Sequence, residues 1–497
     1  MRRRISWLPK LLLALGSIFA AFNSTATADD QVVFANSATV NELRRVGVSL
    51  EVGGNLLVHV DGKEQQLPMQ VKALLRHQER LLEVAQNSAE GRRSVRFYDD
   101  VQAELQVDGK QIDPELRDDR RLLTVAVAGT ETTITGLFGP HTREELDLIK
   151  MPADSLILDR LLPGDDKPRE IDASWKHDAD TMTLLLGLDA VGSTDAESKL
   201  YELTDEMAMI EINGLVHGAV DGIATKIELR GRYYFDRQRK QITGLEMHWK
   251  EKRAVGHTSP GVDVAARLKL HVTPLEEAPM LLDEQLEGRA DGPRVGDELL
   301  EHIVQGGRIR FLHDRRWHVT QEAGPRLTMR LVDDGELIAQ CNLVEQKPLK
   351  EGNRVSLDKF QDDIRRVLGD KFGDFRRAKE SMDSAGHIVY QVDAEGTVSG
   401  MPIKWIYYLI SSKDGRRVSL VFTMEGPLVE KFASLDEGIV SSLELLDKQP
   451  EEAIESTAPQ NGTSAAADQK AKQRSILKPK EVDRSASGNE ASSATKR

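Results

Sequence analysis

The sequence predicts an α+β protein with two folded domains built mainly from antiparallel β-strands. Long stretches alternate apolar and charged residues with a period of two, which is typical of strands with one buried face. Shorter segments carry helix N-caps followed by apolar residues spaced three and four apart. The 497 residues are 39% hydrophobic and 30% charged, an ordinary globular composition, and this length suits two or three domains.

The first thirty residues have the layout of a cleavable secretory signal. Three arginines and a lysine precede an apolar stretch at 11–22, and a small-residue motif ends at Ala28, before Asp29. We expect cleavage between Ala28 and Asp29 and export to the periplasm, the cell surface or the medium. The alternative is a retained signal anchor, but the apolar stretch is short for a spanning helix. No membrane span is therefore expected after the signal at 1–28 is removed.

The segment 29–275 is expected to form a curved, half-barrel-like antiparallel sheet with covering helices. Stretches such as "VGVSLEVGGNLLVHVDGK" and "SVRFYDDVQAELQVDGKQI" alternate and contain Asp-Gly turn signals. A helical insert follows, in which Thr142 and Glu145 form a capping box. "ADSLILDRLLPG" and "DADTMTLLLGLD" predict two further short helices.

The stretch "KIELRGRYYFDRQRKQITGLEMHWKEK" mixes basic and aromatic residues, so it raises the question of nucleic-acid binding. Its alternation places Tyr233 and Phe235 on one face, with Met247 and Trp249 on the next strand, while the basic residues line the other face among glutamates. Nucleic-acid binding needs basic and aromatic groups together on one accessible face. A net charge of −14 also argues against a polyanion partner. These four residues are expected to line an apolar pocket or, alternatively, to form ordinary core under the helices.

An acidic, Gly-rich segment at 276–306 is expected to link the domains and to include a short helix in "VGDELLEHIVQ". The second domain, 307–447, is predicted to be an α/β/α sandwich with an antiparallel sheet. "PIKWIYYLISS" is a strand that is apolar on both faces, so helices should cover both of its faces. Two helices are expected to do this. One has Phe360, Ile364, Val367 and Leu368 on its apolar side, and the other begins with a capping box of Ser434 and Glu437.

The order of elements from "RIRFLHDRRWHV" through "FQDDIRRVLGDKF", "GTVSGMPIKWIYYLI" and "GRRVSLVFTMEG" to "LDEGIVSSLELL" resembles PsbP-like proteins. The resemblance implies an accessory, binding or assembly role and transfers no functional residue. The first domain resembles, in architecture alone, the curved half barrel of LolA-type lipoprotein carriers. From Lys448 to the end the chain has few residues to bury, and 448–497 is predicted to be disordered.

Motifs that carry chemistry are largely absent from the sequence. It has no phosphate loop, no Gly-x-Ser-x-Gly elbow, no paired Cys-x-x-Cys and no His-Glu-x-x-His, so no catalytic residue, cofactor site or metal site is predicted. His313 and His318 are separated by two arginines and do not indicate a metal site. Cys341 is the only cysteine, and its place in an alternating strand favours burial over reactivity.

The composition and motifs favour an exported, non-enzymatic binding or assembly protein for an apolar ligand or an envelope protein. Two alternatives stay open. One is an exported hydrolase whose site is assembled from dispersed residues, and the other is a purely structural interaction protein. The oligomeric state is not predicted.

Overall fold

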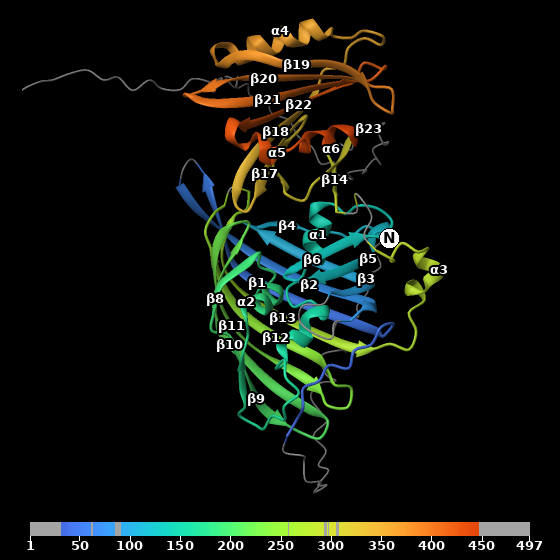
Figure 1. Ribbon diagram of the computed structural model, residues 1–497, viewed down its shortest axis with the longest axis vertical. Coiled ribbons are helices and arrows are strands. Elements are labelled where there is room, and N and C mark those ends of the chain that lie inside the picture. The colour runs from blue at the N-terminus through green and yellow to red at the C-terminus, as the bar shows by residue number, and fades with distance from the viewer. Residues whose placement is uncertain are drawn as a thin grey trace, which may run out of the picture. The chain divides into compact units, whose positions relative to one another are not determined.

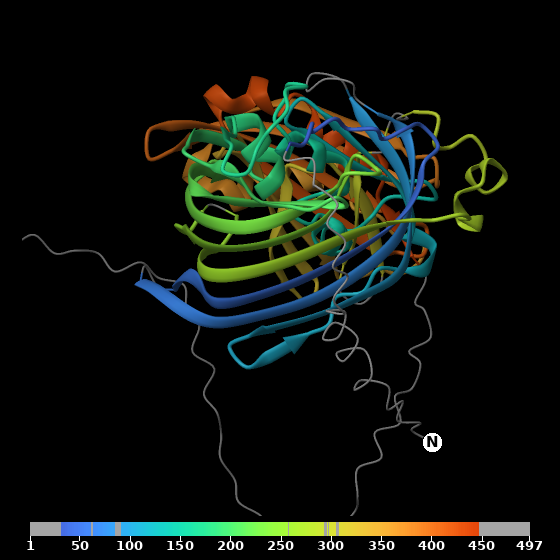
Figure 2. The same cartoon turned by 90° about the horizontal axis from the view of Figure 1, so that it is seen from below.

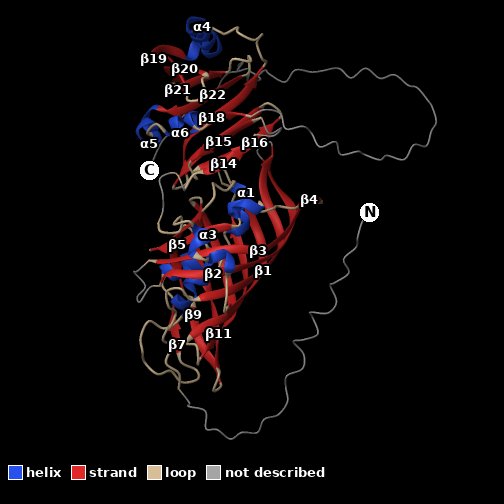
Figure 3. Ribbon diagram, turned by 90° about the vertical axis from the view of Figure 1, so that its right-hand side faces the viewer, coloured by secondary structure: helices blue, strands red, loops and turns tan. Residues whose placement is uncertain are grey.

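The computed structural model describes residues 31–60, 63–84, 91–256, 258–292, 296, 298–304 and 308–446, all within one compact unit. The expected signal, with its cleavage point between Ala28 and Asp29, and the expected disordered tail lie outside the described residues. Strands dominate and helices are few, so the α+β fold class is confirmed (Figure 3). None of the helices in the described ranges is both long and apolar enough to cross a membrane.

The larger sheet contains thirteen strands of the described residues, each antiparallel to its neighbours (Figure 1). Its strands are β1 (Leu43–Val60), β2 (Lys63–Glu83), β3 (Arg92–Val107), β4 (Lys110–Ile112), β5 (Leu122–Ala128), β6 (Glu131–Gly136), β7 (Ser174–Lys176), β8 (Ala190–Thr194), β9 (Glu197–Leu203), β10 (Met207–Val220), β11 (Ile223–Asp236), β12 (Gln241–Arg253) and β13 (Gly261–Pro274). The strand order is β6-β5-β3-β2-β1-β13-β12-β11-β10-β9-β7, with β4 on β3 and β8 on β10. The sheet is open, because β6 and β7 at its two ends do not pair with each other.

The strands of this sheet are strongly bent (Figure 2). We call the face that packs against the 3-10 helix η2 (Ser155–Leu161) and helix α2 (Ala179–Leu186) the inner face. The opposite side is the outer face. Alternation along β11 and β12 matches the sequence prediction, since Ile227 and Tyr233 are buried whereas Lys226 and Arg230 are exposed. One large apolar core therefore lies between the inner face and the two helices.

The short helices around the sheet follow their sequence signals closely. Helix α1 (Arg143–Ile149) has Thr142 as its N-cap, and the capping box of Thr142 with Glu145 is confirmed. Asp154 is the N-cap of η2 and Asp178 is the N-cap of α2. Gly187 is the C-cap of α2 and has a left-handed conformation that glycine adopts readily. Three further short helices are η1 (Asp118–Arg120), η3 (Pro279–Leu281) and α3 (Asp283–Leu286).

The segment that the sequence marks as a linker is partly packed. Leu281 and Leu286 contribute to a small core with Val95 and Leu122, which lie on β3 and β5. The short helix expected in "VGDELLEHIVQ" is wrong, because strand β14 (Leu300–Ile303) lies there and pairs with β15 (Ile309–His313). Leu300 is buried, and the backbone hydrogen bonds between β14 and β15 stabilise a strand at a position where the helical pattern of the sequence is weak.

The carboxy-terminal sheets are also antiparallel. Strands β14, β15 and β23 (Glu444–Leu445) form a three-stranded sheet. A second sheet has the order β16-β17-β18-β22-β21-β20-β19. Its strands are β16 (Trp317–Ala323), β17 (Arg326–Asp333), β18 (Glu336–Gln346), β19 (Phe372–Met382), β20 (Ile388–Val398), β21 (Met401–Ser411) and β22 (Arg417–Glu425). The helical segments are α4 (Leu357–Leu368), η4 (Gly369–Lys371), η5 (Gly426–Leu428), α5 (Val429–Phe432) and α6 (Leu435–Ser441).

Strand β21 is covered on both faces, as its doubly apolar sequence predicts. Trp405 packs in one core with Ile364 of α4, and Ile406 packs in another with Ile439 of α6. Within α4, however, Val367 is 78% exposed, so its assignment to the apolar side is wrong.

The capping box predicted for the last helix is also wrong. Ser434 makes no capping hydrogen bond and lies in a left-handed conformation at φ 66°, whereas a capping residue normally has an extended backbone. The prediction for Cys341 agrees with its position, since the thiol is buried and burial raises its pKa.

Candidate functional site

The inner face carries a buried group of charged side chains where β1, β2 and β3 lie side by side. Glu79 of β2 accepts hydrogen bonds from Arg44 Nη2 at 2.6 Å and from Arg96 Nε at 2.9 Å. Arg96 also binds both carboxylate oxygens of Asp154, at 2.6 and 2.7 Å, and Asp154 is the N-cap of η2. Ser155 donates to Glu79 at 3.0 Å. We call these five residues the ionic cluster, and it ties three strands to the start of η2.

The charges of the ionic cluster are matched, two cations against two carboxylates. Burial alone would raise the pKa of Glu79, but Arg44 and Arg96 hold that pKa well below its usual value. Asp154 follows the same pattern, with burial opposed by Arg96, and its pKa is lowered. Both carboxylates are therefore ionised at neutral pH, which burial permits only because each is paired.

His77 lies beside the ionic cluster and is neutral. Burial, and then the charge of Arg96, lower the pKa of His77 to about 3. Neither ring nitrogen has a hydrogen-bond partner among the described residues, and the ring packs on Tyr98 with centroids 4.9 Å apart. Burial likewise raises the pKa of Tyr98 to about 12. The cluster and its neighbours thus hold no group that exchanges a proton near neutral pH, as a general acid or base would.

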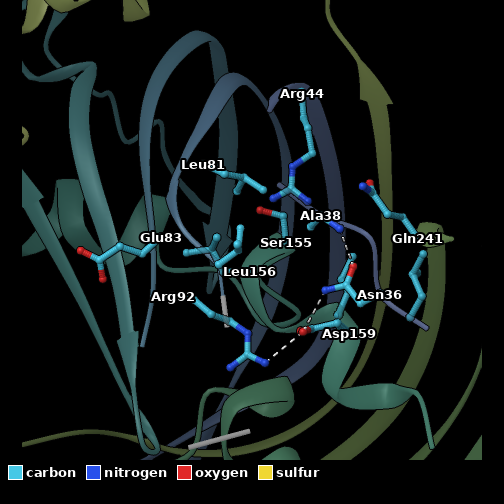
Figure 4. A pocket seen from close by; sticks show the side chains of 13 residues that line it. Asn36, Ala38, Arg44, Leu81, Glu83, Arg92, Ser155, Leu156, Asp159 and Gln241 are labelled. Carbon is cyan, nitrogen blue, oxygen red and sulfur yellow. Dashed lines mark hydrogen bonds and ion pairs between the residues drawn. The ribbon is translucent and has the colours of Figure 1, made fainter. Parts of the chain in front are cut away.

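A small cavity of about 40 Å³ lies against the ionic cluster. Arg44 and Ser155 line it together with Asn36, Arg92 and Asp159 (Figure 4). Asn36 Nδ2 and Arg92 Nη2 both donate to Asp159, at 3.2 and 2.9 Å. The space suits ordered water rather than a ligand.

A larger cleft of about 910 Å³ shares Asn36, Arg92 and Asp159 with this cavity. We call it the polar cleft. Its walls are the amino-terminal segment 34–38, the segment 159–169 and the residues from β7 to the start of α2. Its cationic side chains are Arg92, Arg160, Arg169 and Lys176, and its carboxylates are Asp159, Asp165, Asp166 and Asp178.

Two ionisable groups of the polar cleft have lowered pKa values. Burial lowers the pKa of His177 to about 4, and its Nε2 lies 2.7 Å from Ser198 Oγ. The pKa of Asp165 is lowered by its hydrogen bond from Arg169, at 2.7 Å. At neutral pH the polar cleft therefore presents neutral His177 among the basic and acidic side chains that line it. The lining of the cleft thus carries both signs of charge.

Strand β7 adds backbone groups to the same cleft. It is the last strand of the larger sheet, and its outer edge pairs with no other strand of the described ranges. His177 N donates to Ala196 O, and Trp175 lies opposite Ser198 in the ladder to β9. Because backbone groups alternate in direction along a strand, those of Ser174 and Lys176 point away from β9. An extended chain can pair with such an edge.

The residues predicted to line an apolar pocket or to form core all belong to the main apolar core, which also contains residues of η2. Tyr233, Phe235, Met247 and Trp249 are all buried in the main core of the inner face. Tyr233 Oη donates to Leu161 O at 2.8 Å, and Leu161 O also accepts from Trp175 Nε1 at 2.9 Å. None of the cavities identified among the described residues is lined by these four side chains.

The sequence prediction missed both the ionic cluster and the polar cleft. The cluster joins residues that are far apart in sequence, and charged residues on a strand are normally assigned to the wet face. The sequence contained one indication of the cluster. His77 and Glu79 lie at odd-numbered positions of β2, like the apolar residues Leu75 and Leu81, so all four side chains share the inner face. The cleft has no such signal, because loops form most of its walls.

The comparisons with known proteins find only distant similarities. No family model and no curated protein sequence matches this chain. The solution structure of the cyanobacterial PsbP from Synechocystis sp. PCC 6803 aligns at 15% identity over 31% of this chain and 98% of that one, with a TM-score of 0.26. Lipovitellin, from a structure on lipid–protein interactions, aligns at 6% identity over 48% of this chain and 26% of its own, with a TM-score of 0.24. OccK5 of Pseudomonas aeruginosa aligns at 9% identity over 79% and 98%, with a TM-score of 0.11. With TM-scores this low, none of these similarities bears on the function.

Proposed function

We propose that this protein is an exported, non-catalytic binding protein whose polar cleft receives an extended segment of a protein partner. The larger sheet acts as a half-barrel-like scaffold that holds the cleft. The carboxy-terminal part, as a PsbP-like α/β/α sandwich, is a second module for docking to another envelope component. Two facts together carry this proposal: Trp175 and Lys176 of β7 line a cleft of about 910 Å³, and the outer edge of β7 pairs with no other strand of the described residues.

The edge and the charges of the cleft favour a peptide over other ligands. An added strand takes its affinity from backbone hydrogen bonds and its specificity from the side-chain surroundings. The backbone groups of Ser174 and Lys176 that point away from β9 would supply the affinity. The mixed charges of the lining, such as Arg169 and Asp178, would supply the specificity. A partner segment with both acidic and basic side chains fits this lining.

The ionisation states favour binding over the hydrolase alternative. Acid–base catalysis is most efficient when the pKa of the catalytic group lies near the working pH. His77 and His177, the buried imidazoles on the inner face and in the cleft, have pKa values of about 3 and about 4. Glu79 and Asp154 are paired with arginines and have lowered pKa values. These groups hold their charge states, which suits a rigid binding surface.

A second candidate function, carriage of an apolar ligand, is favoured by one observation. Aliphatic side chains on the inner face of β1, β2 and β3, beyond the part that η2 covers, are only half-buried. They are Leu50, Val52, Leu56, Leu67, Met69, Val71, Val101, Ala103 and Leu105. Partly exposed aliphatic side chains on one sheet face suit an acyl chain. Mass spectrometry of the purified protein under native conditions tests this function, and a co-purifying lipid lost in Val52→Glu supports it.

The primary proposal is tested by site-specific photo-cross-linking in cells that make the protein. A photoreactive amino acid at Lys176, in the cleft, is expected to give one dominant protein adduct. The same amino acid at Lys226, exposed on the outer face, is the matched control. Adducts of equal pattern and yield at both positions would contradict the proposal.

A proline variant distinguishes pairing of the partner with the edge of β7 from non-specific binding in the cleft. Ser174→Pro removes the backbone N–H that points away from β9 and the hydroxyl that donates to Glu197 at 2.7 Å, whereas the backbone hydrogen bonds of the ladder to β9 are kept. The adduct at Lys176 is expected to be lost while the circular dichroism spectrum is unchanged. An adduct that persists in the folded variant shows that the edge of β7 does not bind the partner.

Export is tested separately. Amino-terminal sequencing of the mature protein from the envelope or medium is expected to begin at Asp29. Recovery only in the cytosol, with the first 28 residues retained, contradicts the exported part of the proposal.

A further inference from the structure

A cleft of about 750 Å³ lies between the seven-stranded carboxy-terminal sheet and strand ends of the larger sheet. Residues of β16, β17 and β18 form one side of it. The other side consists of residues from β1 and from the connection between β12 and β13. We call it the neutral cleft. It shares no lining residue with the polar cleft, so the two clefts are separate.

The two sides of the neutral cleft belong to parts of the fold that touch each other. Ser259, which lines the cleft, donates its hydroxyl to Asp221 in the turn between β10 and β11. In the same turn the backbone of Gly222 lies against that of Gly335, which is between β17 and β18. A Cβ atom on Gly222 would come within 2.3 Å of Gly335 Cα, so no side chain fits there.

Uncharged hydrogen-bonding side chains are abundant in the lining. Seven of the fifteen lining residues carry a hydroxyl or an amide, and they are Thr258, Ser259, Thr320, Gln321, Thr328, Gln340 and Asn342. The lining also contains Arg330 and His59, but no carboxylate and no lysine among its described residues. In the polar cleft, eight of nineteen lining residues are charged. A chain that is 30% charged thus leaves this cleft with a single arginine.

The amides and hydroxyls of β17 and β18 form an ordered array on one face of the sheet. Thr328 lies opposite Asn342 in the ladder, and Arg330 lies opposite Gln340. Residues two apart on a strand share a face, so Gln340 and Asn342 are neighbours. Directly opposed residues have their Cβ atoms about 5 Å apart. The array can therefore contact several groups of one ligand at once.

Parts of this array have hydrogen-bonding capacity that the protein does not use. Asn342 Oδ1 accepts from Thr328 Oγ1 at 3.1 Å and from Gln340 Nε2 at 3.4 Å, so both of its lone pairs are engaged. Asn342 Nδ2, in contrast, donates no hydrogen bond to the described residues. Thr258 Oγ1 is buried and also has no partner among them. Buried polar atoms are normally hydrogen-bonded, so Thr258 needs a partner from outside the chain.

We propose that the neutral cleft binds an uncharged carbohydrate. Sugar hydroxyls both donate and accept hydrogen bonds, as the hydroxyls and amides of the lining do. The C–H groups of a sugar ring contact aliphatic side chains, which the β1 and β12–β13 side supplies through Leu56, Val58, Val255 and Pro260. A charged ligand would give up its hydration and find only Arg330 as a counter-charge. The volume lies within the range of about 300–1,000 Å³ that small-ligand sites have.

A peptide fits the neutral cleft less well than a carbohydrate does. A peptide that extends a sheet needs unpaired backbone groups at a strand edge. Thr328, Gln340 and Asn342 instead offer side chains on β17 and β18, and both of these strands are paired on each side. The carbohydrate proposal is independent of the partner segment proposed for the polar cleft.

The first test titrates the full protein with cellobiose, maltose and chitobiose, three uncharged disaccharides, and measures binding by NMR or calorimetry. At least one is expected to bind. Its affinity is expected to change less than about twofold between low and high salt, because a neutral ligand forms no ion pair that salt could screen. Binding of none of the three, or binding that salt abolishes, overturns the proposal.

The second test removes polar groups from the array. Thr328→Val with Asn342→Leu keeps the side-chain sizes and is expected to weaken binding of the disaccharide at least about tenfold, because two or more hydrogen bonds are lost. Thr124→Val with Asn213→Leu is the matched control on β5 and β10, outside the cleft, and should leave the affinity within about twofold. Equal weakening in both double variants overturns the site.

A single variant keeps the test decisive if the double variant does not fold. Thr258→Val lies in the connection between β12 and β13 and removes only the hydroxyl that lacks a partner. It is expected to weaken binding about threefold or more, with an unchanged circular dichroism spectrum. An unchanged affinity in the folded variant contradicts the proposed contact and overturns the assignment of the cleft.

The rival ligand is probed with a capped peptide of alternating alanine and serine. Binding of this peptide, without binding of any of the disaccharides, overturns the carbohydrate proposal in favour of a peptide site. The photo-cross-link at Lys176 reports on the polar cleft alone, because Lys176 does not line the neutral cleft. Failure of one proposal is therefore distinguishable from failure of the other.

Discussion

The two ends of the 3-10 helix η2 are held on the inner face by opposite kinds of chemistry. At its start, Asp154 caps Leu156 N and also binds Arg96, so the attachment is an ion pair within a buried network. At its end, Leu161 O accepts hydrogen bonds from Trp175 and Tyr233, so the attachment is neutral and lies in aromatic core.

Both attachments provide hydrogen-bond partners for backbone groups at the ends of η2, because such groups have no partner inside the helix. They differ in what their loss leaves behind. If one neutral hydrogen bond at the end of η2 is removed, the carbonyl of Leu161 still accepts the other one. If an ion pair at the start is broken, a charged group stays buried without its partner. The start of η2 should therefore depend far more on single residues than its end does.

The largest effect is expected for Arg96→Met. This variant leaves the carboxylates of Glu79 and Asp154 buried with one cation, Arg44, and is expected to lower the unfolding free energy by about 3–5 kcal/mol. Urea denaturation followed by circular dichroism measures the loss. Arg232→Met is the control, since it breaks an exposed pair with Glu211 and is expected to cost less than about 1 kcal/mol. Similar losses in both variants would contradict a special role for burial.

Acidification tests the charged end in another way. Unfolded His77 takes up a proton near pH 6.5, whereas folded His77 stays neutral down to about pH 3. As pH falls from 6.5, the unfolded state binds more protons, so stability decreases. His77 accounts for about 2 kcal/mol of the decrease between pH 6.5 and pH 5.

The variant His77→Leu is expected to remove that share of the acid sensitivity. His177 and His313 also have lowered pKa values, so the variant reduces the decrease and does not abolish it. Unfolding free energies at pH 7 and pH 5 measure the difference. Exposed His271→Leu is the control, and an equal reduction there would show that the effect does not come from burial.

The same contrast explains how far the sequence could predict this molecule. The apolar half of the inner face was predicted well, because Tyr233 and Phe235 alternate with charged residues along one strand. The charged half was not, because Glu79 and Arg96 occupy inward positions that the alternation rule reserves for apolar residues. Their burial is possible only through partners such as Asp154, 58 positions from Arg96, and periodicity gives no information on such pairs.

Helix caps show a similar limit. The Thr142 and Ser434 patterns look equivalent in sequence, yet only Thr142 makes its capping bond. A cap depends on the backbone conformation of the capping residue as well as its type. That conformation is extended at Thr142 and left-handed at Ser434.

A smaller effect is expected for Ser155→Ala at the charged end. The hydroxyl of Ser155 donates to both carboxylate oxygens of Glu79 and accepts from Arg96 Nη2 at 3.2 Å. Hydrogen bonds to charged groups contribute about 1.5–3 kcal/mol. We expect a loss near the lower value, because Glu79 keeps both arginines. Urea denaturation gives the value, and no loss at all would show that the arginines alone satisfy Glu79.

The smallest effect is expected for Tyr233→Phe at the neutral end of η2. The variant removes one hydroxyl and keeps the ring in its core position, and Leu161 O retains its hydrogen bond from Trp175. A neutral hydrogen bond contributes about 0.5–1.5 kcal/mol, and the remaining donor should bring the loss to the lower end. The comparison between Ser155→Ala and Tyr233→Phe is direct, because each deletes one buried hydroxyl at one end of the same helix. If Tyr233→Phe costs more than Ser155→Ala, the neutral attachment governs η2, and the ionic cluster contributes less than its geometry indicates.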